Sequence, residues 1–372
     1  MAGWRNCRFE NMFDFALIVH SETWSGAAAV ISALRGPERS PILLEDVREI
    51  VPWIPPRALC RVTVESAKGH KVHGLCIDCF IPPDRLESRF LRENLARVRE
   101  AAAYAIHERA RIVSLGGFSS ILLEGRMDIL PQHPETAFTT GNTLTVALIV
   151  RGLERALETA GRTLGESNVL VVGASGDVGS GCARYLAPRV TRLLLCARNP
   201  NRLHRFASEF SDRGVPVEAD TDLLNLAPKA DVVICAASAT RPIEMLQALP
   251  PGAIVCDAGY PKNFPPAFAP PEGAVFFGGH AQASAGIRLD PDLLSVIYPY
   301  ALPNVAHACL LEGIALALEK RFEPFSQGRG SITPERVDEI WGIAEGHGIG
   351  LPPLFNREGL VSVPRMAEEL HR

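Results

Sequence analysis

Residues 168–202 have the sequence NVLVVGASGDVGSGCARYLAPRVTRLLLCARNPNR, and this stretch decides the fold of the chain. Residues 168–172 are apolar and rich in valine, which predicts a buried parallel strand. A glycine-spaced turn from Gly173 to Gly179 leads into a helix, and residues 192–196 predict a second strand. This order of strand, turn, helix and strand is typical of a unit that binds a dinucleotide.

The glycine turn predicts where the phosphates of that dinucleotide bind. Its glycines let the backbone approach the pyrophosphate, and the N-terminus of the following helix presents unpaired N–H groups and a partial positive charge. The alternative is a turn with a purely structural role, since glycine turns are common. The residues predicted to bind the cofactor here are Gly173, Ser175, Gly176, Asp177, Val178 and Gly179.

The end of the second strand indicates which dinucleotide binds. A site for NAD places Asp or Glu about 20 residues past the glycines, to hold the ribose 2′-hydroxyl. This chain has CARNPNR there, without a carboxylate, and a guanidinium suits a 2′-phosphate. We therefore predict NADPH, held by Arg198, Asn199 and Arg202, although Arg198 alone could be an ordinary solvated loop residue.

The rest of the chain predicts an α/β protein with a Rossmann-type parallel sheet domain. Strands and helices continue to alternate after the glycine turn, and ligands bind beyond the carboxyl ends of such strands. Ala236, Ser238 and Tyr260 follow two later strands, so we expect them at the cofactor cleft. We predict an N-terminal α/β substrate-binding domain (1–142), a Rossmann NADPH-binding domain (143–288) and a helical C-terminal region (289–372).

Some segments outside the Rossmann domain also have clear patterns. We expect a strand over 13–19, a hairpin that turns at Lys68-Gly69, and one long amphipathic helix over 83–111. Further helices are expected over 143–160 and 304–320, and another from Thr333 to about Gly346.

Composition and charge limit the classes of function. Hydrophobic residues at 47% and charged residues at 22% are ordinary for a globular protein, and a net charge of −4 gives no general reason to expect nucleic-acid binding. No apolar run is long enough to span a membrane, and the N-terminus lacks a signal-peptide layout. The nine cysteines are therefore expected to be reduced thiols in a cytoplasmic protein.

One cluster of histidines and cysteines, HKVHGLCIDC, raises the question of a metal site. His70, His73, Cys76 and Cys79 recur every third residue on a predicted strand, so successive members alternate between its two faces. Four ligands cannot then converge on one ion, and we predict no metal site.

Cys309 is the candidate nucleophile outside the cofactor domain. It lies in LPNVAHACLLEGIALALEKRF, where Pro303 and Asn304 predict that a helix begins just before it. A thiol in the first turns of a helix gains from the helix dipole, although a cysteine in an apolar helix is most often ordinary core packing. Glu312 shares its face, whereas His307 is two positions away and is expected to face elsewhere.

Further segments resemble the long-chain acyl-carrier-protein reductases, which reduce fatty acyl thioesters to aldehydes with NADPH. The resemblance extends over nearly the whole chain. The segments that carry it are VTVESAKGHKVHG with CFIP, LGGFSSILLEG, FTTGNTLT, VVGASGDVGS, CARNPNRL, DAGYPKN and the cysteine before FSQGRGSIT.

The resemblance implies a role for Cys309. In that family the equivalent cysteine takes the acyl group as an enzyme thioester, and hydride from NADPH then releases the aldehyde. It implies an acyl carrier protein or acyl-CoA as the donor, and leaves open a downstream enzyme that consumes the aldehyde. Gly117, Thr140, Asn142 and Glu312 are the residues we expect near the substrate.

Two other functions stay open at this point. The first is an NADP oxidoreductase similar to shikimate dehydrogenase, which would act directly on a small carbonyl or hydroxy acid and need no cysteine. The second is a non-catalytic partner that binds a nucleotide or an acyl carrier within a biosynthetic complex.

Overall fold

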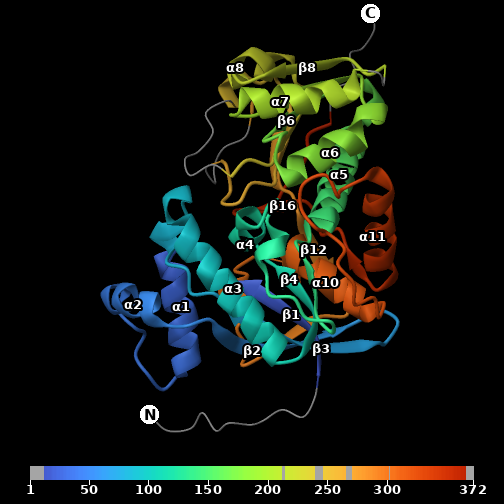
Figure 1. Cartoon of the computed structure of the whole chain (residues 1–372). Helices are drawn as coiled ribbons and strands as arrows, with labels where there is room; N and C mark the ends of the chain where they lie inside the picture. The colour runs from blue at the N-terminus through green and yellow to red at the C-terminus, as the bar shows by residue number, and fades with distance from the viewer. Residues whose placement is uncertain (1–11, 212–213, 239–245, 265–269, 301, 366–372) are drawn as a thin grey trace, which may run out of the picture.

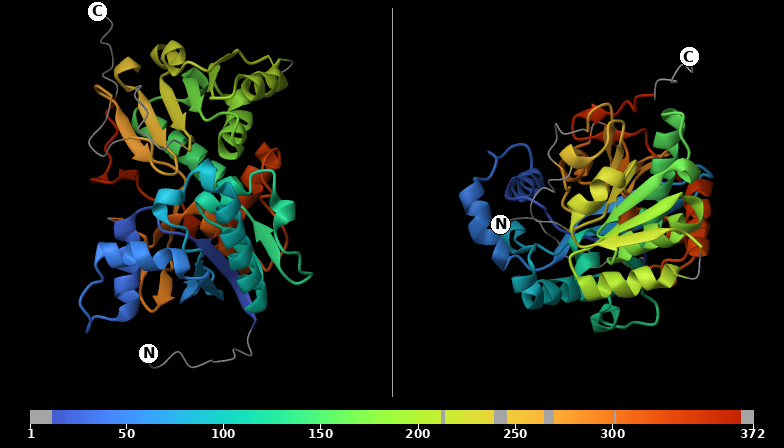
Figure 2. Two further views of the ribbon diagram at one scale, coloured as in Figure 1. Left: turned by 60° about the vertical axis from the view of Figure 1, so that its left-hand side comes forward. Right: turned by 90° about the horizontal axis from the view of Figure 1, so that it is seen from above.

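The computed structural model describes residues 12–211, 214–238, 246–264, 270–300 and 302–365. Two six-stranded sheets dominate these residues. Figures 1 and 2 show the sheets at opposite ends of the molecule, with the C-terminal helices α10 (Ala308–Leu318) and α11 (Pro334–Gly346) beside the N-terminal sheet. Within the described residues, no helix is both long and apolar enough to cross a membrane.

The N-terminal sheet mixes parallel and antiparallel strands. Four neighbouring strands, β3, β1, β4 and β5, run parallel, whereas β2 and β13 extend the sheet through antiparallel pairs. The hairpin between β2 and β3 turns at Lys68-Gly69 as predicted, and Gly69 has a φ of 80°. In sheet order the strands are β13 (Ile287–Asp290), β2 (Arg57–Glu65), β3 (Lys71–Asp78), β1 (Phe13–Val19), β4 (Ala110–Leu115) and β5 (Ala137–Thr139).

The second sheet is parallel throughout and confirms the predicted Rossmann type. Its strand order reverses between β6 and β9, and that switch point lies beside the glycine turn. In sheet order the strands are β11 (Ala274–Phe277), β10 (Ile254–Asp257), β9 (Val232–Cys235), β6 (Asn168–Val172), β7 (Arg192–Cys196) and β8 (Val217–Asp220).

Helices cover both sheets. Among the longer ones, α5 packs against both α6 and α10 and so links the two halves of the molecule. The remaining helices are α1 (Trp24–Arg35), α2 (Leu44–Ile50), α3 (Leu91–His107), α4 (Phe118–Leu122), α5 (Asn142–Thr159), α6 (Asp177–Leu186), α7 (Pro200–Ala207), α8 (Leu223–Leu226) and α9 (Leu294–Ile297).

Two predicted helices begin later than the sequence indicated. The helix expected over 83–111 is α3 alone, preceded by single turns at Pro83–Arg85 and Ser88–Phe90, because Leu86 has a non-helical ψ of 48°. The helix expected from Asn304 begins at Ala308. Its first residues instead form β14 (Val305–His307), which pairs with β12 (His280–Ala283).

The C-terminal part contains strands as well as helices. Besides β14, it contributes β15 (Ile349–Gly350), which pairs with β12, and a small hairpin of β16 (Phe355–Asn356) and β17 (Gly359–Leu360). Strand β13 crosses the boundary predicted at residue 288 and pairs with β2. The three-domain division stays a prediction.

Helix α10 is buried along its whole length. Its sequence ACLLEGIALAL is apolar on all sides, a pattern typical of a helix enclosed by other elements. It packs on β1, β4 and α5, which places its first turn at the junction of the two sheets.

Candidate active site

The glycine turn after β6 packs closely on neighbouring backbone and leads into the N-terminus of α6. Gly173 has a φ of 83°, and a Cβ there would lie 2.6 Å from the Ala236 oxygen. A Cβ at Gly179 would lie 2.3 Å from the Gly173 oxygen. Gly176 caps α6 without a side chain to accept its first N–H groups, so these groups are available to an anion.

Arg202 lies directly against this turn. Its Nη2 donates to the Ser175 oxygen at 2.7 Å. Asn199 caps α7 by accepting the N–H of Arg202 at 3.0 Å, which fixes the start of that helix. Arg198 is exposed just after β7. The segment from Cys196 to Arg202 contains no carboxylate, but Asp220 of the neighbouring strand β8 pairs with Cys196. The helix N-terminus without a side-chain cap and the two arginines that follow β7 fit NADPH, with its extra 2′-phosphate.

A pocket of about 130 Å³ joins the glycine turn to the start of α10. The predicted cofactor residues that line it are Gly176, Asp177, Val178, Ala236, Ser238 and Tyr260. Its lining also includes Gly117, Asn142 and Cys309, which the sequence assigned to the substrate and the chemistry. Thr140, Glu312 and Arg198 do not line this pocket.

Cys309 is the second residue of α10, and only 9% of its surface is exposed. Burial raises the pKa of its thiol to about 11. Hydrogen bonds from backbone N–H groups oppose this shift, and they come from Gly117, Leu310 and Cys309 itself. The thiol therefore sits where donors for a developing negative charge are already in place.

Glycines allow the N-terminal loops to approach Cys309 closely. Gly141 has a φ of 69°, and a Cβ there would lie 2.0 Å from the Cys309 oxygen. A Cβ at Gly116 would lie 2.7 Å from the Leu310 side chain. Alanine at either position would push the start of α10 away from the loops.

Glu312 holds α10 against the start of α5. It has no exposed surface. Its carboxylate accepts hydrogen bonds from the Thr139 hydroxyl, from the Leu144 N–H at 2.9 Å and from the Ser326 hydroxyl at 2.9 Å. Burial raises the pKa of Glu312 above the ordinary glutamate value, and these hydrogen bonds offset part of that rise. Because its oxygens are engaged in this way, Glu312 acts on the position of α10 rather than on a proton of the thiol.

The segment that leads into α5 contributes Thr140, and the first residue of α5 is Asn142. The Thr140 side chain is buried, and its hydroxyl has no hydrogen-bond partner within the described part of the chain. Asn142 donates to Asp177 Oδ2 at 2.7 Å, while Asp177 Oδ1 has no such partner there. Asp177 lines the same pocket as Cys309, and its unpaired oxygen is buried. Burial raises the pKa of Asp177 to about 6.

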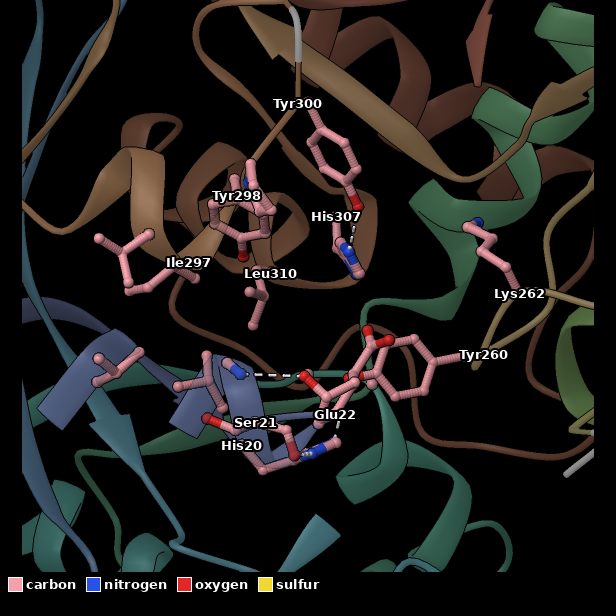
Figure 3. Close-up of a pocket in the computed structure, with 18 of the residues that line it drawn as sticks. His20, Ser21, Glu22, Tyr260, Lys262, Ile297, Tyr298, Tyr300, His307 and Leu310 are labelled. Atoms are coloured by element: carbon pink, nitrogen blue, oxygen red, sulfur yellow. Dashed lines mark hydrogen bonds between the residues drawn. The ribbon is translucent and has the colours of Figure 1, made fainter. Parts of the chain in front are cut away.

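A larger pocket of about 460 Å³ adjoins the first one. The two pockets share Gly117, Gly259, Tyr260, Lys262 and His307. In Figure 3, Tyr298 and Tyr300 lie on one side of the larger pocket, and His20, Ser21 and Glu22 lie on the other. Its apolar lining includes Val19, Val30, Leu59, Val296, Ile297 and Leu310.

A hydrogen-bond chain fixes the protons on the histidines beside the pockets. His280 Nδ1 lies 3.0 Å from the Gly278 oxygen, which can only accept, so Nδ1 carries the proton. Burial lowers the pKa of His280, and its neutral Nε2 accepts the Tyr300 hydroxyl at 2.9 Å. The Tyr300 oxygen then accepts from His307 Nε2 at 3.0 Å (Figure 3). His307, whose pKa burial lowers to about 3, is therefore neutral with an unprotonated Nδ1.

Tyr260 and Lys262 complete the shared wall. The Tyr260 hydroxyl lies 3.4 Å from His20 Nε2, which also accepts the Phe118 N–H at 3.0 Å. Lys262 Nζ donates to the backbone carbonyl oxygen of Asp257 at 3.1 Å, and burial lowers the pKa of Lys262. Both side chains are close enough to the pockets to contact a ligand.

Sequence reasoning missed several residues of this site. Helical spacing from Asn304 predicts that His307 faces away from Cys309, but His307 is the last residue of β14 and lines both pockets. His20 follows β1 directly, so the rule that ligands bind at the carboxyl ends of parallel strands could have found it. Tyr300 carried no such signal, because only the folded chain brings it to His307.

Comparison with known proteins supports an oxidoreductase. Residues 154–274 match the family described as shikimate / quinate 5-dehydrogenase. The chain is 32% identical over 305 residues to the long-chain acyl-[acyl-carrier-protein] reductase of Synechococcus elongatus, an alignment that covers 79% of this chain and 87% of that protein. It is 27% identical over 265 residues to the aminotransferase PigE of Serratia, covering 69% of this chain but 30% of PigE.

Solved structures resemble the chain only loosely. The nucleotide-binding domain of glutamyl-tRNA reductase from Thermoplasma volcanium is 23% identical with a TM-score of 0.27, covering 36% of this chain and 84% of that one. Dipicolinate synthase A chain from Bacillus subtilis is 11% identical with a TM-score of 0.35, covering 84% and 97%. These scores are too low to carry an argument about function.

The Rossmann sheet, its glycine turn and its arginines define an NADP-dependent reductase, and the cofactor is NADPH. The extent of the match to the Synechococcus protein then gives the family. The chain belongs to the long-chain acyl-[acyl-carrier-protein] reductase family.

The contact of Gly141 with Cys309 predicts a specific stability difference. Gly141→Ala and Gly161→Ala both place a side chain at a positive φ, but a Cβ at Gly161 meets no atom within 4 Å. We expect Gly161→Ala to lower the free energy of unfolding by about 1 kcal/mol, and Gly141→Ala to lower it by at least about twice that amount. Denaturant unfolding monitored by circular dichroism measures both, and equal losses would contradict the close contact.

The raised pKa of Cys309 predicts how its reactivity depends on pH. Only the thiolate reacts with iodoacetamide, so below a pKa of about 11 the alkylation rate should rise about tenfold per pH unit. Peptide mass spectrometry can follow Cys309 separately from the other cysteines. A rate that levels off below pH 8 would show that the resting site already holds a thiolate.

Proposed function

We propose that the protein reduces an acyl thioester to an aldehyde with NADPH, through a thioester on Cys309. The observation that carries this proposal is the smaller pocket, which Cys309 lines together with the glycine turn of the Rossmann domain. A cysteine that lines a cofactor site next to a second pocket, one with both apolar and polar lining residues, can hold an acyl group next to a hydride donor.

The first step is a thioester exchange. The Cys309 sulfur forms a bond to the acyl carbon, and the bond between that carbon and the donor's sulfur breaks. The proton of the Cys309 thiol ends on the released thiol of the donor. Because one thioester replaces another, the step has little net free-energy cost, and backbone N–H groups at Gly117 and the start of α10 stabilise the attacking sulfur.

The second step is the reduction. When bound, NADPH supplies the hydride that adds to the acyl carbon. The N–H groups of Gly117, Cys309 and Leu310 are the donors proposed for the resulting oxyanion, since the N–H of Ala308 already donates to the Gly279 oxygen. The N–H groups of Thr143 and Leu144, at the start of α5, already donate to Ser326 and Glu312 and are unavailable. Breaking the carbon–sulfur bond releases the aldehyde, and a solvent proton restores the thiol.

The larger pocket is the proposed site of the acyl group. Its volume of about 460 Å³ falls in the range typical of small-molecule sites, and Leu310 lines it immediately after Cys309 in the chain. The acyl donor is an acyl carrier protein or acyl-CoA, by analogy with the Synechococcus relative. An enzyme that consumes the aldehyde would act downstream.

The acyl-enzyme can be observed directly. Incubation with acyl-CoA or an acyl carrier thioester, without NADPH, should add one acyl group to Cys309, detected by intact-protein and peptide mass spectrometry. Adding NADPH should remove this group and release the aldehyde. Cys309→Ala should abolish both events, whereas Cys182→Ala, which changes a buried thiol in α6, should leave both in place.

The outcomes of this experiment separate the candidate functions. An adduct on another cysteine, or none with any donor, would count against the proposal. Full turnover of a small carbonyl substrate by Cys309→Ala would favour a direct dehydrogenase similar to shikimate dehydrogenase. NADPH binding without aldehyde from any thioester would favour a non-catalytic partner.

The arginine after β7 predicts the preference for NADPH. We expect Arg198→Ala to weaken NADPH binding about tenfold or more, since a hydrogen bond to a charged group contributes roughly 1.5–3 kcal/mol. NADH binding should change little. Fluorescence titration measures both affinities, with Arg92→Ala, on the exposed side of α3, as a control of equal charge change. An equal loss for the two nucleotides would exclude a contact between Arg198 and the 2′-phosphate.

A further inference from the structure

Three charged residues from distant parts of the chain meet beside the glycine turn. Glu124 follows α4 in the N-terminal half, Arg202 lies in α7, and Arg329 lies in the loop between α10 and α11. Arg329 approaches Glu124 Oε1 with Nε at 2.8 Å and with Nη2 at 2.7 Å. Arg202 Nη2 lies 3.7 Å from the same oxygen. One carboxylate oxygen thus faces two guanidinium groups.

These three charged side chains lie next to the predicted cofactor site. Glu124 lines the smaller pocket together with Gly176 and Asp177. Arg202 donates to the Ser175 oxygen within the glycine turn. The charges of Glu124 and Arg329 also act in opposite directions on the pKa of Asp177, which places both near the first turn of α6.

The geometry leaves these arginines suited to a further anion. Two guanidinium groups face one oxygen of a single carboxylate, and Asp177, the second carboxylate nearby, already accepts a hydrogen bond from Asn142. The side chains of Arg202 and Arg329 are 40% and 44% exposed, and Glu124 is 20% exposed, so the arginines can turn without breaking a packed core. A phosphate dianion matches two guanidinium forks better than one carboxylate oxygen does.

We propose that Arg329 is a phosphate-binding residue of the NADPH site, contributed by the C-terminal loop. In the free enzyme Arg329 pairs with Glu124. When NADPH binds, Arg329 turns with Arg202 to the 2′-phosphate, and Glu124, left beside that phosphate, opposes binding. Arg329 and Glu124 therefore set the preference for NADPH from outside the Rossmann domain. This inference rests on the cofactor alone and not on the chemistry of Cys309.

Binding of NADPH and NADH without any acyl donor tests the role of Arg329. Arg329→Gln should weaken NADPH binding about tenfold, as expected for loss of a charge-assisted hydrogen bond, and leave NADH binding unchanged. Nicotinamide fluorescence titration gives both dissociation constants. The matched control is Arg321→Gln, which removes an arginine paired with Glu323 and Glu339 in the same C-terminal region. This control should not change either constant.

Glu124 provides the opposite test. Glu124→Gln removes the competing carboxylate and frees both arginines, so NADPH binding should become several-fold tighter. In the double variant Glu124→Gln with Arg329→Gln, this gain should be smaller, because one of the freed arginines is absent. Glu323→Gln is the matched control for loss of one exposed carboxylate.

Three results would overturn the proposal. They are an equal loss of NADPH and NADH affinity in Arg329→Gln, unchanged NADPH affinity in that variant, and weaker NADPH binding in Glu124→Gln. Thermal unfolding identifies a variant that fails to fold. In that case Arg329→Lys, which keeps the charge, is titrated with 2′,5′-ADP as a probe of the 2′-phosphate alone. An affinity for 2′,5′-ADP below that of the unmodified protein supports the proposal, and an equal affinity contradicts it.

Discussion

The buried carboxylate of Glu312 is the constraint on which the arrangement of the site depends. An ionised carboxylate without exposed surface is costly unless hydrogen bonds satisfy it, and here the donors come from Thr139, the backbone of Leu144 and Ser326. These donors belong to β5, the start of α5 and the C-terminal loop, so Glu312 joins α10 to all three segments. Cys309 lies one turn earlier on α10, and Arg329 lies shortly after Ser326. One polar contact therefore positions both the proposed nucleophile and a residue at the cofactor phosphates.

The two pockets share a wall, and the histidine in that wall, His307, is uncharged. The chain from Gly278 through His280 and Tyr300 leaves His307 neutral, with one ring nitrogen available only as an acceptor. A neutral ring does not attract anions as an imidazolium would, so in the proposed reaction the backbone donors around Cys309 are the groups that stabilise negative charge. Arg202 and Arg329 lie at the other end of the smaller pocket, beside the glycine turn.

The sequence was sufficient for the parts of the structure that local pattern controls. The Rossmann strands, the glycine turn and the helix start at Thr333 follow from residues close together in the chain. The sequence was insufficient where contact with a distant segment determines the local structure. The pairing of Val305–His307 with β12 delays the start of α10, and only this brings His307 to the pockets. Glu124 and Arg329 are separated by most of the chain, and neither has a local motif that announces a phosphate. The assignment of Cys309 depended on family resemblance, because an apolar helix gives no sign of a reactive thiol.

The position of strand β13 has consequences for folding during translation and for recombination between related genes. It is made after the entire Rossmann sheet, yet it covers the edge of β2 in the N-terminal sheet. During translation that edge stays open until the cofactor domain has emerged, and an open edge can pair with strands of other chains. Contacts between such distant segments also form slowly. The N-terminal half is therefore not a module that recombination could exchange by a single crossover. Any exchange between relatives that keeps the sheet closed must carry β13 along with β2.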